Sequence, residues 1–423
     1  MDGIEERAAG ARGAAEALDA ADPLADFRDR FVIDDPSLVY LDGNSLGRLP
    51  RATEARLATL VRDGWGGDLI RGWDGWLDWP TRIGDLIGTA LLGARPGETV
   101  VADSTTVNLY RLAAAALDAR PGRRTIVTDR DNFPTDRYVL EGLAEARGLA
   151  IRWIDGAPVD GPSPADVAAA LGAGTPGAGG SDPEDVALIV LSHVNYRSAA
   201  IADMAAITAL AHEAGALTLW DLCHSVGSVP VELTAAGADL AVGCTYKYLN
   251  SGPGGPAFLY VRSELQDVLR NPVQGWFGRR DQFAMAEGFE PEPGIRSWLV
   301  GTSPILALAA VEEGARLSAE AGIGPIRAKG IALTDYAIGL HDELLAPFGC
   351  TLGSPRDARH RGDHVSIRHP DARRLCRELI AAGVVPDFRE PDSIRLGLAP
   401  LYTRFVDVHE GISRLRTILE RHA

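Results

Sequence analysis

The sequence predicts an α/β protein, with a mostly parallel central sheet in a large domain and a smaller α+β domain at the C-terminal end. Its 423 residues suffice for such a pair of units. Short apolar, β-branched runs alternate with helical patterns through the middle of the chain. From about residue 304 a long alanine-rich helical pattern leads into a stretch of different texture. Together these observations indicate two domains of different construction.

Seven apolar runs are the expected strands of the sheet: ETVVAD, RTIVTD, LAIRWID, VALIVLS, ALTLWD, LAVGC and PAFLYV. Helical patterns such as TTVNLYRLAAAALDA and MAAITALAHEAG lie between them. Continuous apolar strands separated by helices are typical of a parallel sheet that is covered on both faces. The segment 156–185 is rich in Gly and Pro around one short helix, and we expect it at the surface.

The C-terminal part contains two further strand patterns, HVSIRH and DSIRLGLAP, and two helical ones. The first residues read as an amphipathic helix and not as a signal peptide, because they are acidic and lack a basic head before an apolar stretch. We therefore expect an N-terminal segment, 1–49, that packs with the small domain. Residues 50–309 form the expected large domain and 310–423 the small one.

Composition excludes several classes of function. A formal charge of −16 argues against binding to nucleic acid or to an anionic membrane surface, since both need a basic face. No apolar run is long enough for a transmembrane helix. The four cysteines are scattered without a CxxC spacing, which argues against a zinc site or a disulfide framework. That pattern fits a reducing cytosol, so we expect a cytoplasmic protein.

Polar side chains follow five of the expected strands. Ligands bind at the carboxyl ends of the strands in open parallel sheets, so these positions are candidates for one convergent site. The first strand is followed by the hydroxyls of Thr105 and Thr106 at a helix start, the second by the ring of Phe133 and the acid Asp136, and the third by the hydroxyl of Ser192. The remaining two are followed by the acid Asp221 with the imidazole of His224, and by the phenol of Tyr246 with the amine of Lys247.

Each of these residues also has a purely structural interpretation. Thr105 and Thr106 could cap a helix, which is a common role for Ser and Thr. Asp221 could be a turn residue, His224 an interior histidine and Phe133 a core side chain. Lys247 alone could be a surface charge, although an apolar strand and the run NSGPGG flank it.

Lysine is rare in this chain. Of 42 basic residues only Lys247 and Lys329 are lysines, and Lys329 lies on a helical pattern that reads as a solvated face. Coding bias toward arginine explains scarcity by itself, so the position of Lys247 matters more. A primary amine condenses with an aldehyde to an imine, and a guanidinium does not.

Taken together, the strand-end residues suit a phosphorylated aldehyde cofactor. A carboxylate at Asp221 would keep a pyridine nitrogen protonated and make the ring an electron sink. A helix N-terminus with two hydroxyls is a ready phosphate site. Phe133 or His224 could stack on the faces of the ring.

The chain resembles the kynureninase family, whose members use pyridoxal 5′-phosphate and belong to the fold-type I aminotransferase superfamily. The matching segments follow the family's order along nearly the whole chain: YLDGNSLGRLP, DLIRGW, DSTTVNLYRL, DNFPTDRY, SHVNYRS, WDLCHSVGSVPVEL, CTYKYLNSGPGG, GWFG, GTSPILALAAVE and IRLGLAPLY. The combination of WD..HS.G with YKYLNSGPGG is far more specific than a single glycine motif.

The resemblance implies a role for each matching position. Lys247 would hold the cofactor as an imine and move protons at Cα, Asp221 would pair with the pyridinium nitrogen, and Tyr246 would donate a proton to Cβ. The implied cofactor contacts are Thr105, Thr106, Phe133, Asp136, Ser192, Asp221, His224, Tyr246, Lys247, Trp276 and Thr302. Arg395 would clamp the α-carboxylate, while Ser45 and Trp73 (or Trp65) would line the aryl end. The superfamily also implies a homodimer whose second subunit contributes phosphate contacts.

The implied reaction is hydrolytic cleavage of L-kynurenine or 3-hydroxy-L-kynurenine to anthranilate or its 3-hydroxy analogue, with release of L-alanine, in tryptophan metabolism. Three departures from the family pattern put the preferred substrate in question: Ser198-Ala199 for the common Thr-Gly, Arg279 for a common His, and Ser303 in GTSP. Alternatives within the superfamily are a transaminase and a cysteine desulfurase, for which Cys350 is the only candidate thiol. A binding protein that retains the fold is the non-enzymatic alternative.

Overall fold

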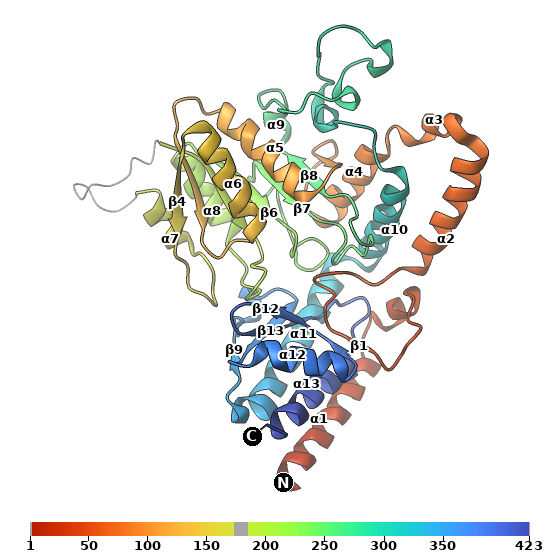
Figure 1. Cartoon of the computed structure of the whole chain (residues 1–423), viewed down its shortest axis with the longest axis vertical. Coiled ribbons are helices and arrows are strands. Elements are labelled where there is room, and N and C mark those ends of the chain that lie inside the picture. The colour runs from red at the N-terminus through yellow and green to blue at the C-terminus, as the bar shows by residue number, and fades with distance from the viewer. Residues whose placement is uncertain (1, 173–184, 423) are drawn as a thin grey trace.

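The computed structural model describes residues 2–172 and 185–422. Figure 1 shows a large part that contains the central sheet and, below it, a smaller part that carries both ends of the described chain. The short helix expected within 156–185 is α7 (Pro164–Ala170), while residues 173–184 of that segment lie outside the described residues. No helix in the described part of the chain is long and apolar enough to cross a membrane.

The central sheet has seven strands in the order β2-β8-β7-β6-β5-β3-β4. All of its pairings are parallel except those of β8, which is antiparallel to β7 and β2, so the predicted mostly parallel sheet is confirmed. Each strand corresponds to one of the seven apolar runs. The strands are β2 (Thr99–Val101), β3 (Thr125–Asp129), β4 (Ala150–Ile154), β5 (Val186–Ser192), β6 (Leu217–Asp221), β7 (Leu240–Gly243) and β8 (Phe258–Val261).

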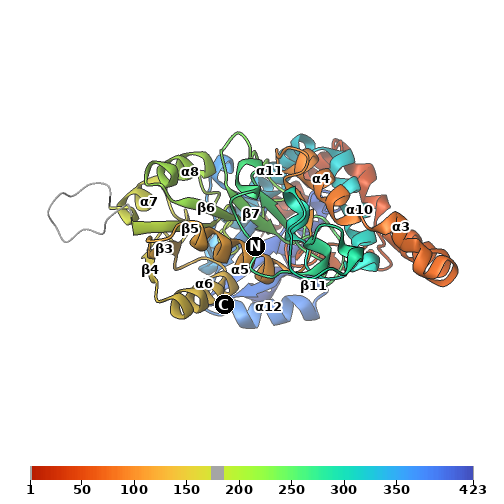
Figure 2. The ribbon, with the colours of Figure 1, turned by 90° about the horizontal axis from the view of Figure 1, so that it is seen from above.

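Helices cover both faces of this sheet (Figure 2). Alternate side chains of a strand enter two separate cores: Val127 of β3 packs into one core and Ile126 into the other. This alternation is the period-two geometry of a strand, and it explains why the runs are apolar throughout. The helices of the large part are α2 (Arg51–Thr59), α3 (Trp73–Trp76), α4 (Trp79–Leu91), α5 (Thr105–Asp118), α6 (Pro134–Arg147), α7, α8 (Met204–Glu213), α9 (Ser263–Gln266) and α10 (Ile305–Ala321).

The smaller part is built on an antiparallel sheet in the order β12-β13-β10-β9, together with a parallel pair of β1 and β11. Helix α1 packs against α13, and Ala15, Val39 and Leu41 of the N-terminal segment enter the same core as α13. The elements are α1 (Asp2–Ala20), β1 (Val39–Tyr40), α11 (Ile323–Leu340), β9 (Thr351–Leu352), β10 (His364–Arg368), α12 (Ala372–Ala381), β11 (Val384–Val385), β12 (Asp387–Arg389), β13 (Ser393–Gly397) and α13 (Phe405–Glu420).

The division of the chain into 1–49, 50–309 and 310–423 stays a prediction. The boundary at 309/310 falls inside α10, which packs on α2 and α4 of the large part. Leu308 and Ala315 of this helix belong to one core of the central sheet, whereas Ala321 contacts side chains of the smaller part. Helix α10 therefore connects the two parts.

Lys329 does not lie on a solvated face, so that interpretation was wrong. Its side chain is 5% exposed, and Nζ lies 2.6 Å from Oδ2 of Asp22, whose side chain is 4% exposed. Burial lowers the pKa of Lys329, while Asp22 opposes that shift. The helical period of α11 was read correctly, but the sequence does not reveal that the segment after α1 supplies a buried carboxylate. The pair fastens the N-terminal segment to α11.

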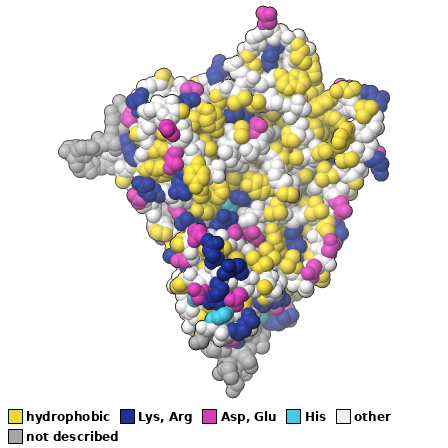
Figure 3. Space-filling view, viewed as in Figure 1, with side chains coloured by type: hydrophobic (Ala, Val, Ile, Leu, Met, Phe, Trp, Pro, Cys, Tyr) yellow, Lys and Arg dark blue, Asp and Glu magenta, His cyan; other side chains and the backbone are white. Residues whose placement is uncertain are grey.

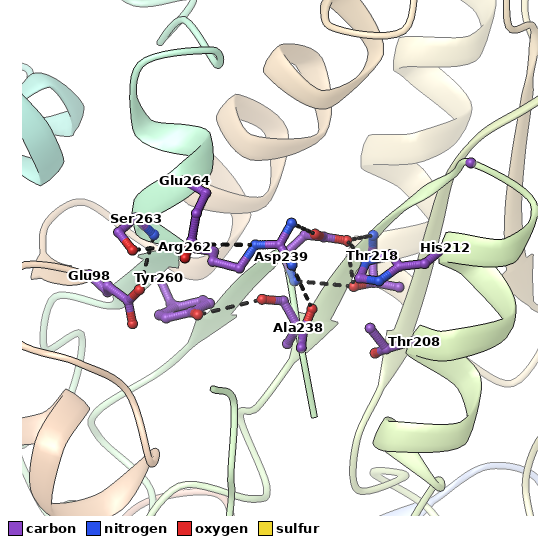
Figure 4. Close-up of polar contacts among 12 residues, drawn as sticks. Glu98, Thr208, His212, Thr218, Ala238, Asp239, Tyr260, Arg262, Ser263 and Glu264 are labelled. Carbon is purple, nitrogen blue, oxygen red and sulfur yellow. Dashed lines mark hydrogen bonds and ion pairs between the residues drawn. The ribbon is translucent and has the colours of Figure 1, made fainter. Parts of the chain in front are cut away.

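A buried polar cluster joins β6, β7 and β8 at the amino end of β7 (Figure 4). Asp239 is fully buried, and its Oδ2 accepts hydrogen bonds from the backbone N–H of Thr218 and from His212 Nε2, each at 2.9 Å. Arg262 pairs with the other carboxylate oxygen at 2.9 Å. This cluster lies at the sheet end opposite to the carboxyl ends of the parallel strands, so it stabilises the sheet and leaves the ligand-binding end free.

Candidate active site

A cavity of about 290 Å³ lies at the carboxyl ends of the central strands. Side chains from the large part and from the smaller part line it. The structure brings ten of the residues predicted from the sequence to this cavity: Ser45, Thr105, Thr106, Phe133, Asp136, Asp221, His224, Tyr246, Lys247 and Arg395. The parallel arrangement of β3, β5, β6 and β7 accounts for this convergence, because strand ends far apart in sequence meet at one edge.

Lys247 lies in the loop after β7, with its Nζ 3.3 Å from Nε2 of His224 and 6.0 Å from the ring centroid of Phe133. Burial, followed by the charge of Lys247, lowers the pKa of His224 well below its ordinary value. The imidazole is therefore neutral near pH 7, and its Nε2 is able to accept a hydrogen bond from the amine.

Glycine holds this loop close to the N-terminal segment. The backbone N–H of Gly47 donates to the carbonyl of Tyr246 at 2.8 Å. A Cβ at Gly47 would lie 2.4 Å from the carbonyl oxygen of Lys247, a distance that real Cβ atoms do not adopt. The close approach places Ser45, two residues earlier, at the cavity.

Asp221 and Asp136 form a buried carboxyl pair. Asp221 ends β6, and its Oδ1 accepts a hydrogen bond from the backbone N–H of Cys223 at 2.8 Å. Asp136 is fully desolvated, and burial together with the charge of Asp221 raises its pKa well above the ordinary value. The neutral form of Asp136 is therefore favoured beside Asp221. Within the described part of the chain, no arginine or lysine forms an ion pair with Asp221.

Helix α5 points its N-terminus at the cavity. Ser104 caps the helix by accepting a hydrogen bond from the backbone N–H of Val107, so the N-cap role belongs to Ser104 and not to the two threonines. The backbone N–H groups of Thr105 and Thr106 stay free of intrahelical partners, as in the first turn of any helix. Thr105 Oγ1 lies 3.7 Å from Cys223 Sγ. The free N–H groups and the helix dipole make this end suitable for an anion.

Tyr246 precedes Lys247 and is partly buried. The neighbouring Cys244 sulfur and burial raise the pKa of Tyr246, so its phenol stays protonated at neutral pH. Cys223 and Cys244 are both neighbours of Tyr246, and the backbone N–H of Cys244 donates to Cys223 Sγ at 3.2 Å.

Arg395 brings a cation from the smaller part to the cavity. Its guanidinium is 1% exposed, and Nη1 donates to the carbonyl of Tyr196 at 2.6 Å. Nη2 donates to Ser45 Oγ at 2.8 Å and to Asp387 Oδ2 at 2.6 Å. The predicted clamp for a carboxylate is thus paired with a carboxylate of the chain itself.

Four other predicted residues do not line this cavity. Ser192 donates to Asn132 Oδ1 at 2.7 Å. Thr302 is exposed, and Trp276 is 38% exposed with its ring at the edge of Phe277. Trp73 lies with Trp65 in a separate apolar pocket of about 430 Å³, which Ser303 also lines.

Three residues that line the cavity were not singled out in the sequence: Thr135, Cys223 and Arg389. Thr135 and Cys223 stand beside predicted site residues, so a closer reading of the strand ends would have included them. Arg389 comes from β12, and the sequence held no signal that this strand pairs with the one that carries Arg395.

The structure also locates the departures from the family pattern. Ala199 has φ +68°, a left-handed conformation that favours glycine, which gives a physical reason for the glycine common at this position. Ala199 is fully buried next to Ser198. Arg279 does not line the cavity, and it donates to the backbone carbonyls of Gly288 and Arg280.

Comparisons with known proteins agree with this geometry. Residues 326–415 match the family described as the kynureninase C-terminal domain. The chain is 44% identical over 413 residues to the kynureninase of Pseudomonas fluorescens, covering 96% of this chain and 94% of that one. It is also 44% identical over 420 residues to the kynureninase of Burkholderia pseudomallei (strain 1106a), covering 97% and 96%.

Solved structures share the fold at much lower identity. A cysteine desulfurase of Escherichia coli superposes with a TM-score of 0.77 at 16% identity, covering 94% of this chain and 98% of that one. The apo cysteine desulfurase of Thermococcus onnurineus NA1 gives a TM-score of 0.76 at 18% identity, covering 91% and 95%. These likenesses confirm the predicted α/β fold class alone. The near-full-length identity to curated relatives is decisive for the family: the chain belongs to the kynureninases.

Proposed function

We propose that this protein is a pyridoxal 5′-phosphate-dependent kynureninase. It cleaves the Cβ–Cγ bond of L-kynurenine, 3-hydroxy-L-kynurenine or both by hydrolysis, and it releases L-alanine and the corresponding anthranilate. The observation that carries the proposal is one cavity in which Lys247, the Asp221–Asp136 pair and Arg395 meet, in a chain 44% identical to curated kynureninases. The reaction belongs to the kynurenine branch of tryptophan catabolism, which also serves NAD biosynthesis.

The residues present fit the cofactor. Asp221 is a buried carboxylate without a cationic partner in the described residues, and a protonated pyridine nitrogen would supply one. The N-terminus of α5 with Thr105 and Thr106 fits the phosphate, and Lys247 provides the amine for the aldehyde. When bound, the cofactor withdraws electrons from the substrate's Cα.

Each remaining group acts on the substrate or on a proton. Lys247 takes and returns the proton at Cα, and the neutral His224 beside it is able to accept a hydrogen bond from the amine. Tyr246 keeps its phenolic proton and is the donor to Cβ. A positioned acid or base of this kind contributes about 10²–10⁴-fold to the rate. Arg395 holds the α-carboxylate end. Ser45 accepts a hydrogen bond from Arg395, which favours a place for Ser45 at the carboxylate end and not at the aryl end that the resemblance implied.

The protein acts as a cytoplasmic homodimer in this proposal. Hydrophobic side chains gather on one face of the large part (Figure 3). Trp65, Leu69 and Ile70 are 60%, 61% and 77% exposed, and they line the apolar pocket to which Trp73 also belongs. Apolar patches of this kind mark protein interfaces. In this proposal the aryl end keeps Trp73. The cofactor contacts keep Ser192, Trp276 and Thr302, of which Trp276 and Thr302 reach a site across the interface.

The candidate thiol of the desulfurase alternative does not suit that role. Cys350 is 3% exposed, and burial raises its pKa to about 11, so it lacks the thiolate character that such a nucleophile needs. The transaminase alternative would use the same cavity and is separated from the proposal by its products.

The test compares kcat/KM for L-kynurenine and 3-hydroxy-L-kynurenine, with L-alanine release as the readout. We expect turnover of at least one substrate with equimolar alanine and anthranilate product. The matched control is Lys247→Arg, which keeps the charge and abolishes turnover. If neither substrate is cleaved by a protein that holds the cofactor on Lys247, the kynureninase assignment is wrong.

A further inference from the structure

Three charged residues of the smaller part share one face of its sheet. Asp387 lies directly opposite Arg395 in the antiparallel pairing of β12 and β13. Arg389 is two residues further along β12, so its side chain leaves the same face as that of Asp387. Cross-strand partners and i, i+2 neighbours come into contact on such a face. Asp387 Oδ2 is 2.6 Å from Arg395 Nη2 and 2.6 Å from Arg389 Nη2.

The three residues differ in depth. The Arg395 side chain is 1% exposed, that of Asp387 19% and that of Arg389 32%. Both arginines line the cavity, so Arg389 stands nearer to solvent and Arg395 nearer to the interior. Asp387 bridges them.

The donors of Arg395 are almost fully engaged. Nη1 donates to the Tyr196 carbonyl, and Nη2 is shared between Ser45 and Asp387. Nε lies 3.1 Å from the Asn44 amide oxygen in the orientation that satisfies that side chain. One N–H on Nη1 remains. A carboxylate that binds through a guanidinium fork needs two parallel N–H donors, so it cannot bind Arg395 in this way while Asp387 stays.

We propose that Asp387 is a stand-in for the substrate's α-carboxylate: it occupies Arg395 in the empty site and is held by Arg389 when the substrate takes its place. This inference rests on the proposed function, because it takes the substrate to be an α-amino acid.

Charge balance supports the exchange. With Arg389 present, two guanidinium groups face Asp387 and the incoming carboxylate, one for each anion. Without Arg389, two carboxylates would compete for the buried guanidinium of Arg395. Asp42 Oδ1 also lies 3.9 Å from Arg395 Nη2, and burial raises the pKa of Asp42 to about 6, which favours its neutral form over a further anion beside Arg395. Arg389 is thus the positioning residue that makes displacement of Asp387 feasible.

A simpler interpretation is that Asp387 and Arg395 form a structural cross-strand pair with no part in binding. A second is that Arg389 attracts the carboxylate directly. The two interpretations and the proposal differ in what happens when Asp387 and Arg389 are changed separately and together.

The test uses holoenzyme and two non-cleavable probes, L-alanine and L-alaninamide, of which the second lacks the carboxylate. Their dissociation constants are measured by calorimetry for wild type, Asp387→Asn, Arg389→Gln and the double variant. The amide of the Asp387→Asn variant would keep a neutral acceptor opposite Arg395 and preserve the strand pair. We expect Asp387→Asn to bind L-alanine about tenfold more tightly, which corresponds to about 1.4 kcal/mol. Binding of L-alaninamide changes less than twofold.

Arg389→Gln is expected to weaken L-alanine binding about tenfold when Asp387 is present and less than threefold in the Asp387→Asn background. An equal loss in both backgrounds would mean direct attraction by Arg389 and would overturn the proposal. Weaker or unchanged L-alanine binding by Asp387→Asn, with the thermal midpoint of wild type, would mean a structural pair. KM for L-kynurenine should follow the L-alanine constants, whereas cleavage of L-kynurenine by wild type tests the proposed function separately.

Discussion

Gly314 controls the position of the loop that carries Lys247. It lies on α10, and a Cβ at this position would stand 1.8 Å from the carbonyl oxygen of Leu249, two residues after Lys247. Real Cβ atoms do not approach other heavy atoms closer than 3.0 Å, so Gly314→Ala forces the helix and the loop apart by about 1.2 Å. The obstacle is main chain and not the end of a flexible side chain. A rotamer change therefore does not relieve it.

The magnitude follows from two opposing effects. Alanine in place of glycine within a helix stabilises by about 1 kcal/mol. Overpacking a dense core costs about 1–3 kcal/mol, and a clash with main chain belongs at the upper end. We expect Gly314→Ala to lose about 2 kcal/mol of unfolding free energy net. Displacement of the loop also moves Lys247 relative to Asp221, so cofactor affinity should fall by at least tenfold.

Gly339→Ala is the matched control. Gly339 lies on α11, and its Cβ would meet no atom within 4 Å, so this variant should gain up to about 1 kcal/mol. Chemical unfolding measures both stabilities, and absorbance titration of the apoprotein measures cofactor affinity. If Gly314→Ala matched the control in stability and wild type in cofactor affinity, the packing of α10 would not position the loop.

Three further predictions concern buried residues outside the cavity. Lys329→Met leaves Asp22 buried without its partner, so the free energy of unfolding should fall by about 3–5 kcal/mol in chemical unfolding. A second change, Asp22→Asn, should restore most of this loss. A loss below about 0.5 kcal/mol would indicate an exposed lysine. Burial lowers the pKa of His193 to about 4, so between pH 6.5 and 4 the unfolded chain binds a proton that the folded chain does not, and stability falls on acidification. His193→Gln should remove about 3 kcal/mol of that loss by pH 4, and parallel pH profiles for variant and wild type would contradict this. Ala199→Gly should raise the free energy of unfolding by about 0.5 kcal/mol, because relief of the left-handed strain slightly exceeds the cost of the added entropy of the unfolded chain. A fall of about 1 kcal/mol would show that Ala199 is not strained.

Local patterns were enough to predict the sheet and most of the cavity. Apolar runs identify strands, and the parallel arrangement carries the residues after each strand to one edge, so Asp221 and Lys247 were placed without any long-range information. The same rule found Phe133 and Asp136 after β3.

Contacts between distant segments could not be predicted in this way. The partner of Lys329 lies after α1, more than three hundred residues earlier in the chain, and helical periodicity alone placed that lysine in solvent. Asp387 faces Arg395 only because β12 and β13 pair in one particular register. The conformation of Ala199 is a backbone property that its side chain does not signal.

The central claim is that Lys247 is the residue that holds the cofactor. The chain has two lysines, so borohydride reduction of the holoenzyme followed by mass mapping of its peptides gives an unambiguous site. The account predicts one cofactor mass on the peptide that contains Lys247 and none on Lys329, whose amine is buried against Asp22. Attachment at Lys329, or a protein that turns over L-kynurenine with Lys247 unmodified, would contradict it.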